Sequence, residues 1–397
     1  MVSPERTVVG APAPWQIDVV DSVSEIPPEV WRKLAPPDDP IYEYALFQAM
    51  ERAGIGPDAY RYLLLRQGQQ IRAVLPTCAY RALALEDALG NEGRRALRPL
   101  HRLMGRPLHI RLLLCGHLLG EGRVLRADAL DESAPHLLIE AVRRLSASMG
   151  TRWTVFKDFP QADLEWLDPA LRRAGYFRAP GLPDAHISLH TTTFEEYVST
   201  LSRNNRSTTR RNLARFSEHD DVTMEVRERF DDLVPAMMPL YEAVLDHAES
   251  RLDVWTPEFF SLLSTDPRIS AKAVTCWEKD RLVGFLVCLF GAKNAVAIRI
   301  GIDYDCSREL RLYQVTYYRG IEEAIRLGMA DINLTQTAYE AKRKMGCHLV
   351  RFEHAVTHSN PVCRTILRHV FPMALNRSGD RGQDGARGQD GSARHGT

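Results

Sequence analysis

The apolar and polar positions of the chain give the same order of elements twice. In the first half, residues 41–54 carry apolar side chains at helical spacing, and residues 60–80 form two strand-like runs around a polar turn at Gln67–Gln70. In the second half, residues 233–251 have helical spacing, and residues 272–302 give strands around a second polar turn. Each half therefore predicts a helix followed by a β-hairpin.

The correspondence continues beyond the hairpins. Each half goes on with a strand, a helix that closes on a glycine, a further strand, and a basic helical turn leading through a glycine into a last strand. These elements are residues 109–116, 133–150, 151–159 and 171–179 in the first half, and 295–302, 309–329, 330–337 and 341–350 in the second. We infer a tandem duplication of an α/β unit with its boundary near residues 186–196; a chance succession of strands and helices is the alternative.

The length of 397 residues agrees with two domains. We expect a flexible N-terminus over residues 1–15, a first domain over 16–190 and a second domain over 191–373. Residues 374–397 contain "RGQDG" twice and almost no apolar side chains, so we expect a disordered tail.

Composition excludes several classes of protein. The chain is 45% hydrophobic and 26% charged with no net charge, which is typical of a globular protein. No apolar run approaches the roughly 18 residues of a membrane span, and the N-terminus lacks a signal-peptide pattern. The seven cysteines, an odd number, predict reduced thiols rather than a disulfide framework. We therefore expect a cytoplasmic protein.

A metal site is not expected. Cys347, His354, His358 and Cys363 are the candidate ligands, but no CxxC or HExxH motif accompanies them. We interpret the two histidines as flanking the end of a strand.

Several loose motifs carry a resemblance to a known family. In the second half they are "YVSTLSRNNRSTTRRNLARF" (197–216), "LYEAVLDHAESRLDVWTPEFF" (240–260) and "YEAKRKMG" (339–346). In the first half they are "FQAMERAG" and "LRRAGYFRAP". Together with the element order, they resemble the GNAT acyltransferase fold, doubled as in the Fem-type transferases, over most of residues 16–373. The resemblance implies an α/β, layered α+β fold with two GNAT-like domains, each a mixed central sheet flanked by helices.

One departure from GNAT enzymes that use acetyl-CoA bears on the donor. Those enzymes carry an Arg/Gln-x-x-Gly-x-Gly/Ala loop whose backbone amides hold a pyrophosphate at a helix N-terminus. The corresponding segment here, "YDCSRELRLYQ" (304–314), has no glycine, and "CGHLLGEGRVLRAD" (115–128) has glycines at the wrong spacing. Fem-type transferases also lack that loop, and they take an aminoacyl group from tRNA.

The chemistry needs a nitrogen nucleophile, a place for its proton and a hydrogen-bond donor for the tetrahedral oxyanion. The resemblance places the reaction where central strands splay apart, with the backbone of Ile300, Gly301 and Ile302 as the oxyanion donor. Asp303 and Asp305 are the nearest acids for proton removal, but aspartates in loops are more often turn formers. The amine can instead lose its proton through water or the leaving group.

Polar residues after the last central strand complete the expected catalytic set. Thr335, Gln336 and Tyr339 suit substrate hydrogen bonding, and their alternative role is that of an ordinary polar loop. Lys342 is the lysine that the family pattern points to, for holding a carboxylate, a phosphate or developing negative charge. Its alternative is a solvated lysine on a helical turn.

Positive charge gathers in residues 201–216. Arg203, Arg206, Arg210 and Arg211 fall on a predicted helix, and we expect them to bind the donor phosphates. A second arginine cluster lies in residues 94–111. Two basic patches on a neutral chain favour tRNA over coenzyme A, while a solvated helix face is the alternative for residues 201–216.

The sequence thus predicts an aminoacyltransferase that moves an aminoacyl group from aminoacyl-tRNA to the nitrogen of a small molecule or peptide, in natural-product (antibiotic) or cell-wall biosynthesis. It needs no cofactor. The first alternative is an N-acyltransferase that uses acyl-CoA or an acyl carrier protein as donor. The second is a non-catalytic module that binds tRNA or peptide.

Overall fold

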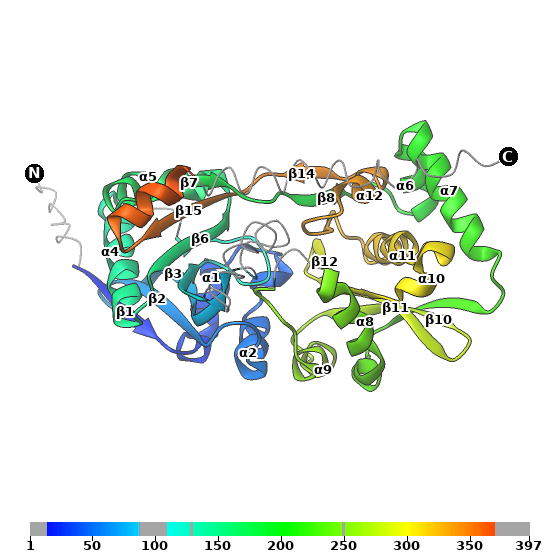
Figure 1. Ribbon diagram of the computed structural model, residues 1–397, viewed down its shortest axis with the longest axis horizontal. Coiled ribbons are helices and arrows are strands. Elements are labelled where there is room, and N and C mark those ends of the chain that lie inside the picture. The colour runs from blue at the N-terminus through cyan, green and yellow to red at the C-terminus, as the bar shows by residue number, and fades with distance from the viewer. Residues whose placement is uncertain (1–13, 86, 88–108, 128–129, 248–250, 370–397) are drawn as a thin grey trace, which may run out of the picture.

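The computed structural model describes residues 14–85, 87, 109–127, 130–247 and 251–369. The predicted N-terminal lead-in up to residue 13, the tail from residue 370 and most of the arginine cluster at 94–111 lie outside these residues. Within them the chain forms two mixed sheets side by side, each with helices on both faces (Figure 1). This confirms the predicted fold of two GNAT-like domains.

The elements of the first half follow the predicted order. In chain order they are β1 (Trp15–Val20), η1 (Val23–Glu25), α1 (Pro28–Leu34), η2 (Pro40–Tyr42), α2 (Tyr44–Ala53), β2 (Ala59–Gln67), β3 (Gln70–Ala84), β4 (His109–Cys115), β5 (Leu125–Arg126), α4 (Ser133–Ser148), β6 (Trp153–Phe159), α5 (Gln161–Arg173) and β7 (Phe177–Pro180). The predicted hairpin turn is present, with Gln67 opposite Gln70 and Gly68 at a φ of 60°.

The second half repeats the series. Its elements are β8 (Asp184–Ser188), α6 (Phe194–Thr200), α7 (Arg203–Ser217), β9 (Val222–Arg227), η3 (Asp231–Leu233), α8 (Val234–His247), α9 (Pro257–Thr265), β10 (Ala271–Glu278), β11 (Arg281–Phe290), β12 (Asn294–Ile302), α10 (Tyr304–Leu310), α11 (Leu312–Arg326), β13 (Asp331–Asn333), α12 (Tyr339–Lys344), β14 (His348–Val350) and β15 (Glu353–His358). Residues 361–369 are helical and end the described chain.

The two sheets exchange a strand. The first runs β1-β2-β3-β4-β6-β15-β7 and the second runs β9-β10-β11-β12-β13-β8-β14. β15, from the end of the chain, thus lies between β6 and β7, and β8, which follows β7 in sequence, lies between β13 and β14. The predicted domains 16–190 and 191–373 describe the order of the repeat, but no single cut of the chain separates the two sheets.

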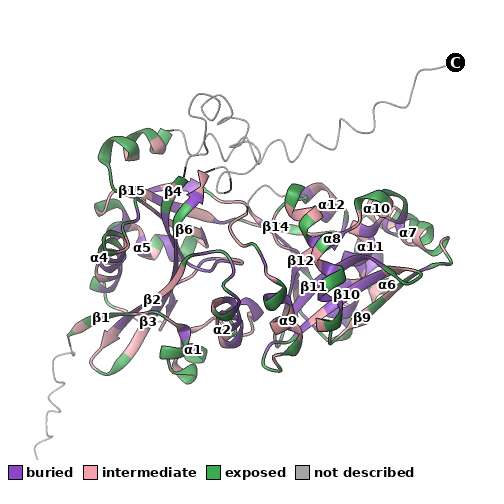
Figure 2. Cartoon of the chain, turned by 60° about the horizontal axis from the view of Figure 1, so that its bottom comes forward, coloured by how far each residue is buried: buried purple, intermediate pink, exposed green. Residues whose placement is uncertain are grey.

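The inner faces of the two domains share one apolar core. α2 of the first domain packs beside α9 of the second, and the cluster continues from Trp31 and Tyr62 to Trp255 and Phe285. Figure 2 places the buried residues on the strands of both sheets and on the helix sides that face them. Tyr80 donates a hydrogen bond to the carbonyl of Leu252 (2.6 Å), which adds a polar tie between the domains.

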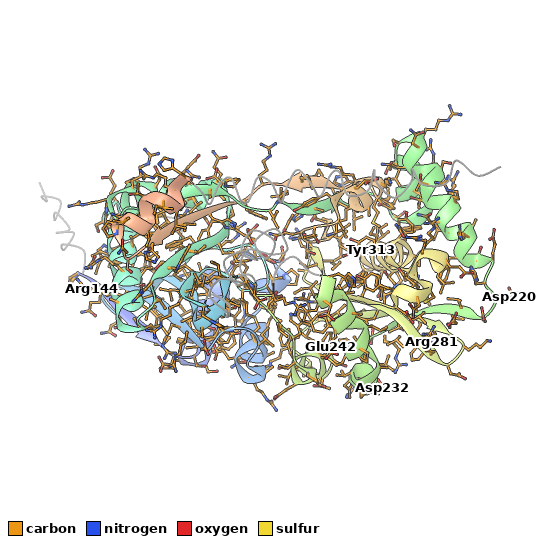
Figure 3. The ribbon with its side chains drawn as sticks, viewed as in Figure 1. Arg144, Asp220, Asp232, Glu242, Arg281 and Tyr313 are labelled. Carbon is orange, nitrogen blue, oxygen red and sulfur yellow. The ribbon has the colours of Figure 1, made fainter. Side chains whose placement is uncertain are left out.

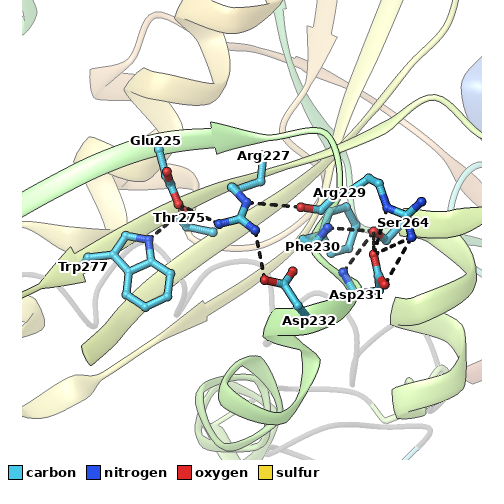
Figure 4. Close-up of polar contacts among 9 residues, drawn as sticks. All are labelled: Glu225, Arg227, Arg229, Phe230, Asp231, Asp232, Ser264, Thr275 and Trp277. Atoms are coloured by element: carbon cyan, nitrogen blue, oxygen red, sulfur yellow. Dashed lines mark hydrogen bonds and ion pairs between the residues drawn. The ribbon is translucent and has the colours of Figure 1, made fainter. Parts of the chain in front are cut away.

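The edge of the second sheet is held by local polar contacts (Figure 4). Arg227 of β9 donates to Asp232 at 3.0 Å, and Ser264 of α9 accepts from the backbone N–H groups of Phe230 and Asp231 at 2.7 and 3.0 Å. These bonds fix the connection from β9 into α8, on the face opposite α11.

Candidate active site between two diverging strands

The parallel strands β12 and β13 separate after a short pairing. Their register runs from Asn294 opposite Asp331 to Val296 opposite Asn333, where β13 ends, while β12 continues to Ile302. On its other side β12 carries a bulge, because Cys288 faces Ala297 and Val287 faces Arg299, which leaves Ile298 without a partner. Such bulges bend a strand and redirect its backbone groups. β12 is therefore without a strand partner on this side beyond Val296, in the part of the sheet where the resemblance implies that central strands splay apart.

The loop that follows β13 has an unusual backbone. Thr335, Thr337 and Ala338 all have left-handed φ values, of 63°, 65° and 48°. A residue with a Cβ pays about 1–2 kcal/mol for this conformation. The predicted strand 330–337 is accordingly reduced to three residues, since this loop turns away from the sheet after Asn333.

Lys342 holds this loop from the inside. Its Nζ donates to the backbone carbonyls of Thr335 at 3.1 Å and Gln336 at 2.7 Å, and the residue is only 1% exposed. Burial lowers the pKa of the Lys342 amine to about 7, while the nearby Asp184 carboxyl opposes that shift. The side chain is therefore an internal group, and the alternative of a solvated lysine is wrong.

The other predicted catalytic residues meet at the same place. The Gln336 amide donates to the carbonyl of Leu182 at 3.1 Å, and the Tyr339 hydroxyl donates to the carbonyl of Pro183 at 2.9 Å. The structure thus brings Thr335, Gln336, Tyr339 and Lys342 together, with Gln336 and Tyr339 tying the loop to the segment that leads into β8. Their catalytic roles stay a prediction.

The proposed oxyanion segment lies beyond the bulge. Ile300, Gly301 and Ile302 form the last part of β12 and pair with β11. A Cβ on Gly301 would lie 2.1 Å from the ring of Phe285, so packing alone requires glycine there. The bulge at Ile298 is a feature that sequence reasoning missed, since the apolar pattern of the strand runs through it unbroken.

The segment "YDCSRELRLYQ", which stands in place of the pyrophosphate loop, is helical on both sides of Arg311. Asp303 caps α10 by accepting from the N–H of Asp305 at 2.9 Å, and its carboxylate also pairs with Arg281. Arg281 lies toward the outer end of the second domain in Figure 3. The side chain of Asp303 is therefore engaged in capping and ion pairing. α10 ends at Leu310, and Arg311, with a φ of 58°, redirects the chain into α11.

The arginine-rich stretch forms α7, as predicted. Ser202 caps the helix, Arg206 donates to the carbonyl of Ser199 at 2.7 Å, and Arg210 pairs with Glu195. Among the described residues Arg203 makes no hydrogen bond or ion pair through its side chain. Arg211 is the one of the four arginines that lines a cavity, and the binding of donor phosphates by all four stays a prediction.

That cavity lies between α7, α11 and α12 and has a volume of about 570 Å³. Three cations line it, Arg211, Arg311 and Lys344, together with Glu340, which pairs with Lys344 at 2.7 Å. The Nε of Arg311 is buried without a hydrogen-bond partner. The excess of positive charge suits a phosphate or another anion. Sequence reasoning missed Arg311 and Lys344, although both stand in segments it singled out.

A buried acid, Asp184, lies beside the loop. Asp184 accepts from the side-chain amide of Asn333 at 2.6 Å, and burial raises the pKa of its carboxyl. Burial likewise raises the pKa of Glu121, in the first domain, to about 7. The sequence offered no signal for Asp184, because its contact with Asn333 depends on the pairing of the distant strands β8 and β13.

The four candidate metal ligands are dispersed. His354 accepts from the N–H of Asp158 at 3.1 Å, and His358 accepts from the N–H of Asn360 at 2.9 Å. In the described part of the chain, no group of three or more His, Cys, Asp or Glu side chains is placed to hold a metal. No helix there is long and apolar enough to cross a membrane.

Comparison with known proteins agrees with the doubled fold. Residues 203–343 match the family described as acetyltransferase (GNAT) domain. FemX shares 9% identity with the chain and superposes with a TM-score of 0.56, covering 89% of this chain and 100% of FemX. No curated protein sequence matches the chain.

Two further solved structures share the fold. The C-terminal domain of an Agrobacterium fabrum protein described as a lysylphosphatidylglycerol synthetase is 12% identical, with a TM-score of 0.53 and coverage of 87% of this chain and 95% of that domain. L-PGS from Bacillus licheniformis is 12% identical, with a TM-score of 0.50 and coverage of 84% and 97%.

Residues 203–343 thus carry an acetyltransferase (GNAT) domain, and the whole chain has the doubled fold seen in FemX. The predicted resemblance to a tandem, Fem-like GNAT acyltransferase fold is thereby confirmed.

Proposed function

We propose that the protein transfers an aminoacyl group from aminoacyl-tRNA to the nitrogen of a small-molecule or peptide acceptor. The proposal rests on the segment that connects β12 to α11. Where a glycine loop would present backbone amides to a pyrophosphate, this chain has the helix α10, and the cations Arg211, Arg311 and Lys344 line the neighbouring cavity instead. Side-chain cations suit the exposed phosphates of a nucleic-acid backbone.

The step itself is an aminolysis of an ester. The acceptor amine attacks the aminoacyl carbonyl, a C–N bond forms, the ester C–O bond breaks, and the ribose hydroxyl leaves with a proton. We propose that backbone N–H groups of β12, between the bulge at Ile298 and Ile302, donate hydrogen bonds to the oxyanion. This part of β12 is no longer paired with β13. Lys342 holds the loop after β13, on the other side of the proposed site, through its hydrogen bonds to the carbonyls of Thr335 and Gln336.

The similar solved structures support an aminoacyl-tRNA donor only through the names that they carry. One is described as a lysylphosphatidylglycerol synthetase, a name that states a lysyl group in the product, and FemX has the doubled fold. At these identities the likeness concerns the fold, so the donor assignment rests on the cavity.

The test is a transfer assay with radiolabelled aminoacyl-tRNA and a panel of amines. We expect label in the amine product and its loss after RNase treatment. Charge reversal of Arg211, Arg311 and Lys344 to glutamate should weaken tRNA binding at least about tenfold, whereas Arg32→Glu on α1 should not. Activity that resists RNase and requires acyl-CoA or an acylated carrier protein would contradict the proposal, as would tRNA binding that is indifferent to the three reversals.

A further inference from the structure

A groove of about 940 Å³ lies on the outer side of the first domain, between the edge strand β1 and the helix α4. Its floor is apolar and includes Ile17 and Val19 of β1, Ala141 and Leu145 of α4, and Met149, which directly follows α4. Val19 is 45% exposed, which is unusual for a valine on the inward face of a strand. The domain therefore leaves part of its apolar face uncovered.

The second domain shows what covers the same place. β9 is its edge strand and α11 is its counterpart of α4. There, Met224 and Val226 of β9 pack in one cluster with α11, and Phe194 of α6 and Leu213 and Phe216 of α7 join that cluster. Among the described residues no helix takes this position in the first domain. The duplication thus indicates that an amphipathic helix fits the groove.

Charges on the rim define the kind of helix. Three arginines line the groove, Arg61, Arg81 and Arg144. Arg61 pairs with Asp21 at 3.0 Å and Arg144 pairs with Glu140 at 3.0 Å, while Arg81 is exposed and has no ion pair in the described part of the chain. Arg144 lies at the outer edge of the first domain in Figure 3, and its side chain is 76% exposed. The rim has an excess of positive charge and favours acidic side chains.

We propose that this groove docks an acidic amphipathic helix of a partner protein, with apolar side chains on the β1–α4 floor and carboxylates against Arg81 and Arg144. The helical residues 361–369 of a second copy are a poorer occupant. They do expose Val362 and Ile366, but they also carry Arg364 and Arg368 and no acid. Their charge has the same sign as the rim.

The test uses a designed, dye-labelled helical peptide of about 16 residues, with leucines along one face and glutamates elsewhere. Its matched control has lysines in place of the glutamates. Binding to the full-length protein is followed by fluorescence anisotropy. We expect the glutamate peptide to bind at least about tenfold more tightly than the lysine peptide.

Variants separate the floor from the rim. Val19→Asp and the double change Arg81→Glu with Arg144→Glu should each weaken the glutamate peptide about tenfold, while Val362→Asp and Arg32→Glu should leave it unchanged. Each variant is first shown to melt cooperatively like the parent. The proposal is overturned if neither peptide binds or if Val19→Asp has no effect. It is also overturned if a single-stranded RNA displaces the peptide and the RNA binding depends only on the arginines of the rim. A self-association of the protein that fills the groove and is abolished by Val362→Asp would overturn it as well.

Discussion

The side-chain amine of Lys342 lies 2.7 Å from the carbonyl oxygen of Gln336, six residues earlier in the chain. With the second bond to Thr335, it fixes a loop in which three residues other than glycine adopt left-handed backbone angles. An ionisable side chain placed inside the domain thus sets the shape of the loop that follows β13.

Replacing Lys342 with methionine should impair both folding and transfer. Methionine has a similar length but leaves the carbonyls of Thr335 and Gln336 without their donor, which costs about 1–3 kcal/mol. We expect transfer to fall more than tenfold because the loop relaxes. Arg343→Met, an exposed change on the same helix, is the control and should alter neither quantity. Parent-like turnover in the Lys342 variant would remove this residue from the mechanism.

The same amine should make stability depend on pH. Its pKa is about 7 in the folded protein and about 10.4 in an unfolded chain, so the unfolded state binds more protons between these values. The free energy of unfolding of the parent, relative to the Lys342→Met variant, should therefore rise with pH across that window, by up to about 1.4 kcal/mol per pH unit. Urea unfolding at pH 7, 8 and 9 measures the difference. If the difference in the free energy of unfolding does not change with pH, the lysine stays charged when buried.

Backbone strain in the loop can be tested at Ala338. This residue has a φ of 48° directly before α12, where glycine is free of the Cβ penalty. Ala338→Gly should stabilise the protein by about 1 kcal/mol, whereas Ala341→Gly inside the helix should destabilise it by a similar amount. Denaturant midpoints of the two variants decide the matter, and equal losses in both would argue against strain at Ala338.

Gly301 should tolerate no side chain for reasons of packing. Gly301→Ala brings a methyl group against the ring of Phe285, and we expect a loss of about 1–3 kcal/mol. Gly284→Ala, whose added Cβ meets nothing closer than 3.7 Å, is the matched control. Adding Phe285→Leu should recover part of the loss in Gly301→Ala. Thermal melts of the three variants check this. If the second change rescues folding but not transfer, Gly301 has a role beyond packing.

Local sequence patterns predicted the elements and their repetition, because helical and strand spacing are local signals. The hairpin at Gln67–Gln70 and the helix carrying Arg203 to Arg211 appear where expected. The patterns could not predict which strand pairs with which, since that choice depends on contacts between distant segments. For the same reason the burial of Lys342 was not predicted: a basic helical turn looks solvated until the loop over it is known.

The exchange of β15 also has a consequence for how the polypeptide is made. The synthesis of β7 is complete at residue 180, but the strand that pairs beside it, β15, begins only at residue 353. At a synthesis rate of 5–20 residues per second, roughly 10–35 s pass before the first sheet can close. During that interval β6 and β7 have no strand between them, so the nascent first domain has unpaired backbone edges until translation of the second is nearly complete.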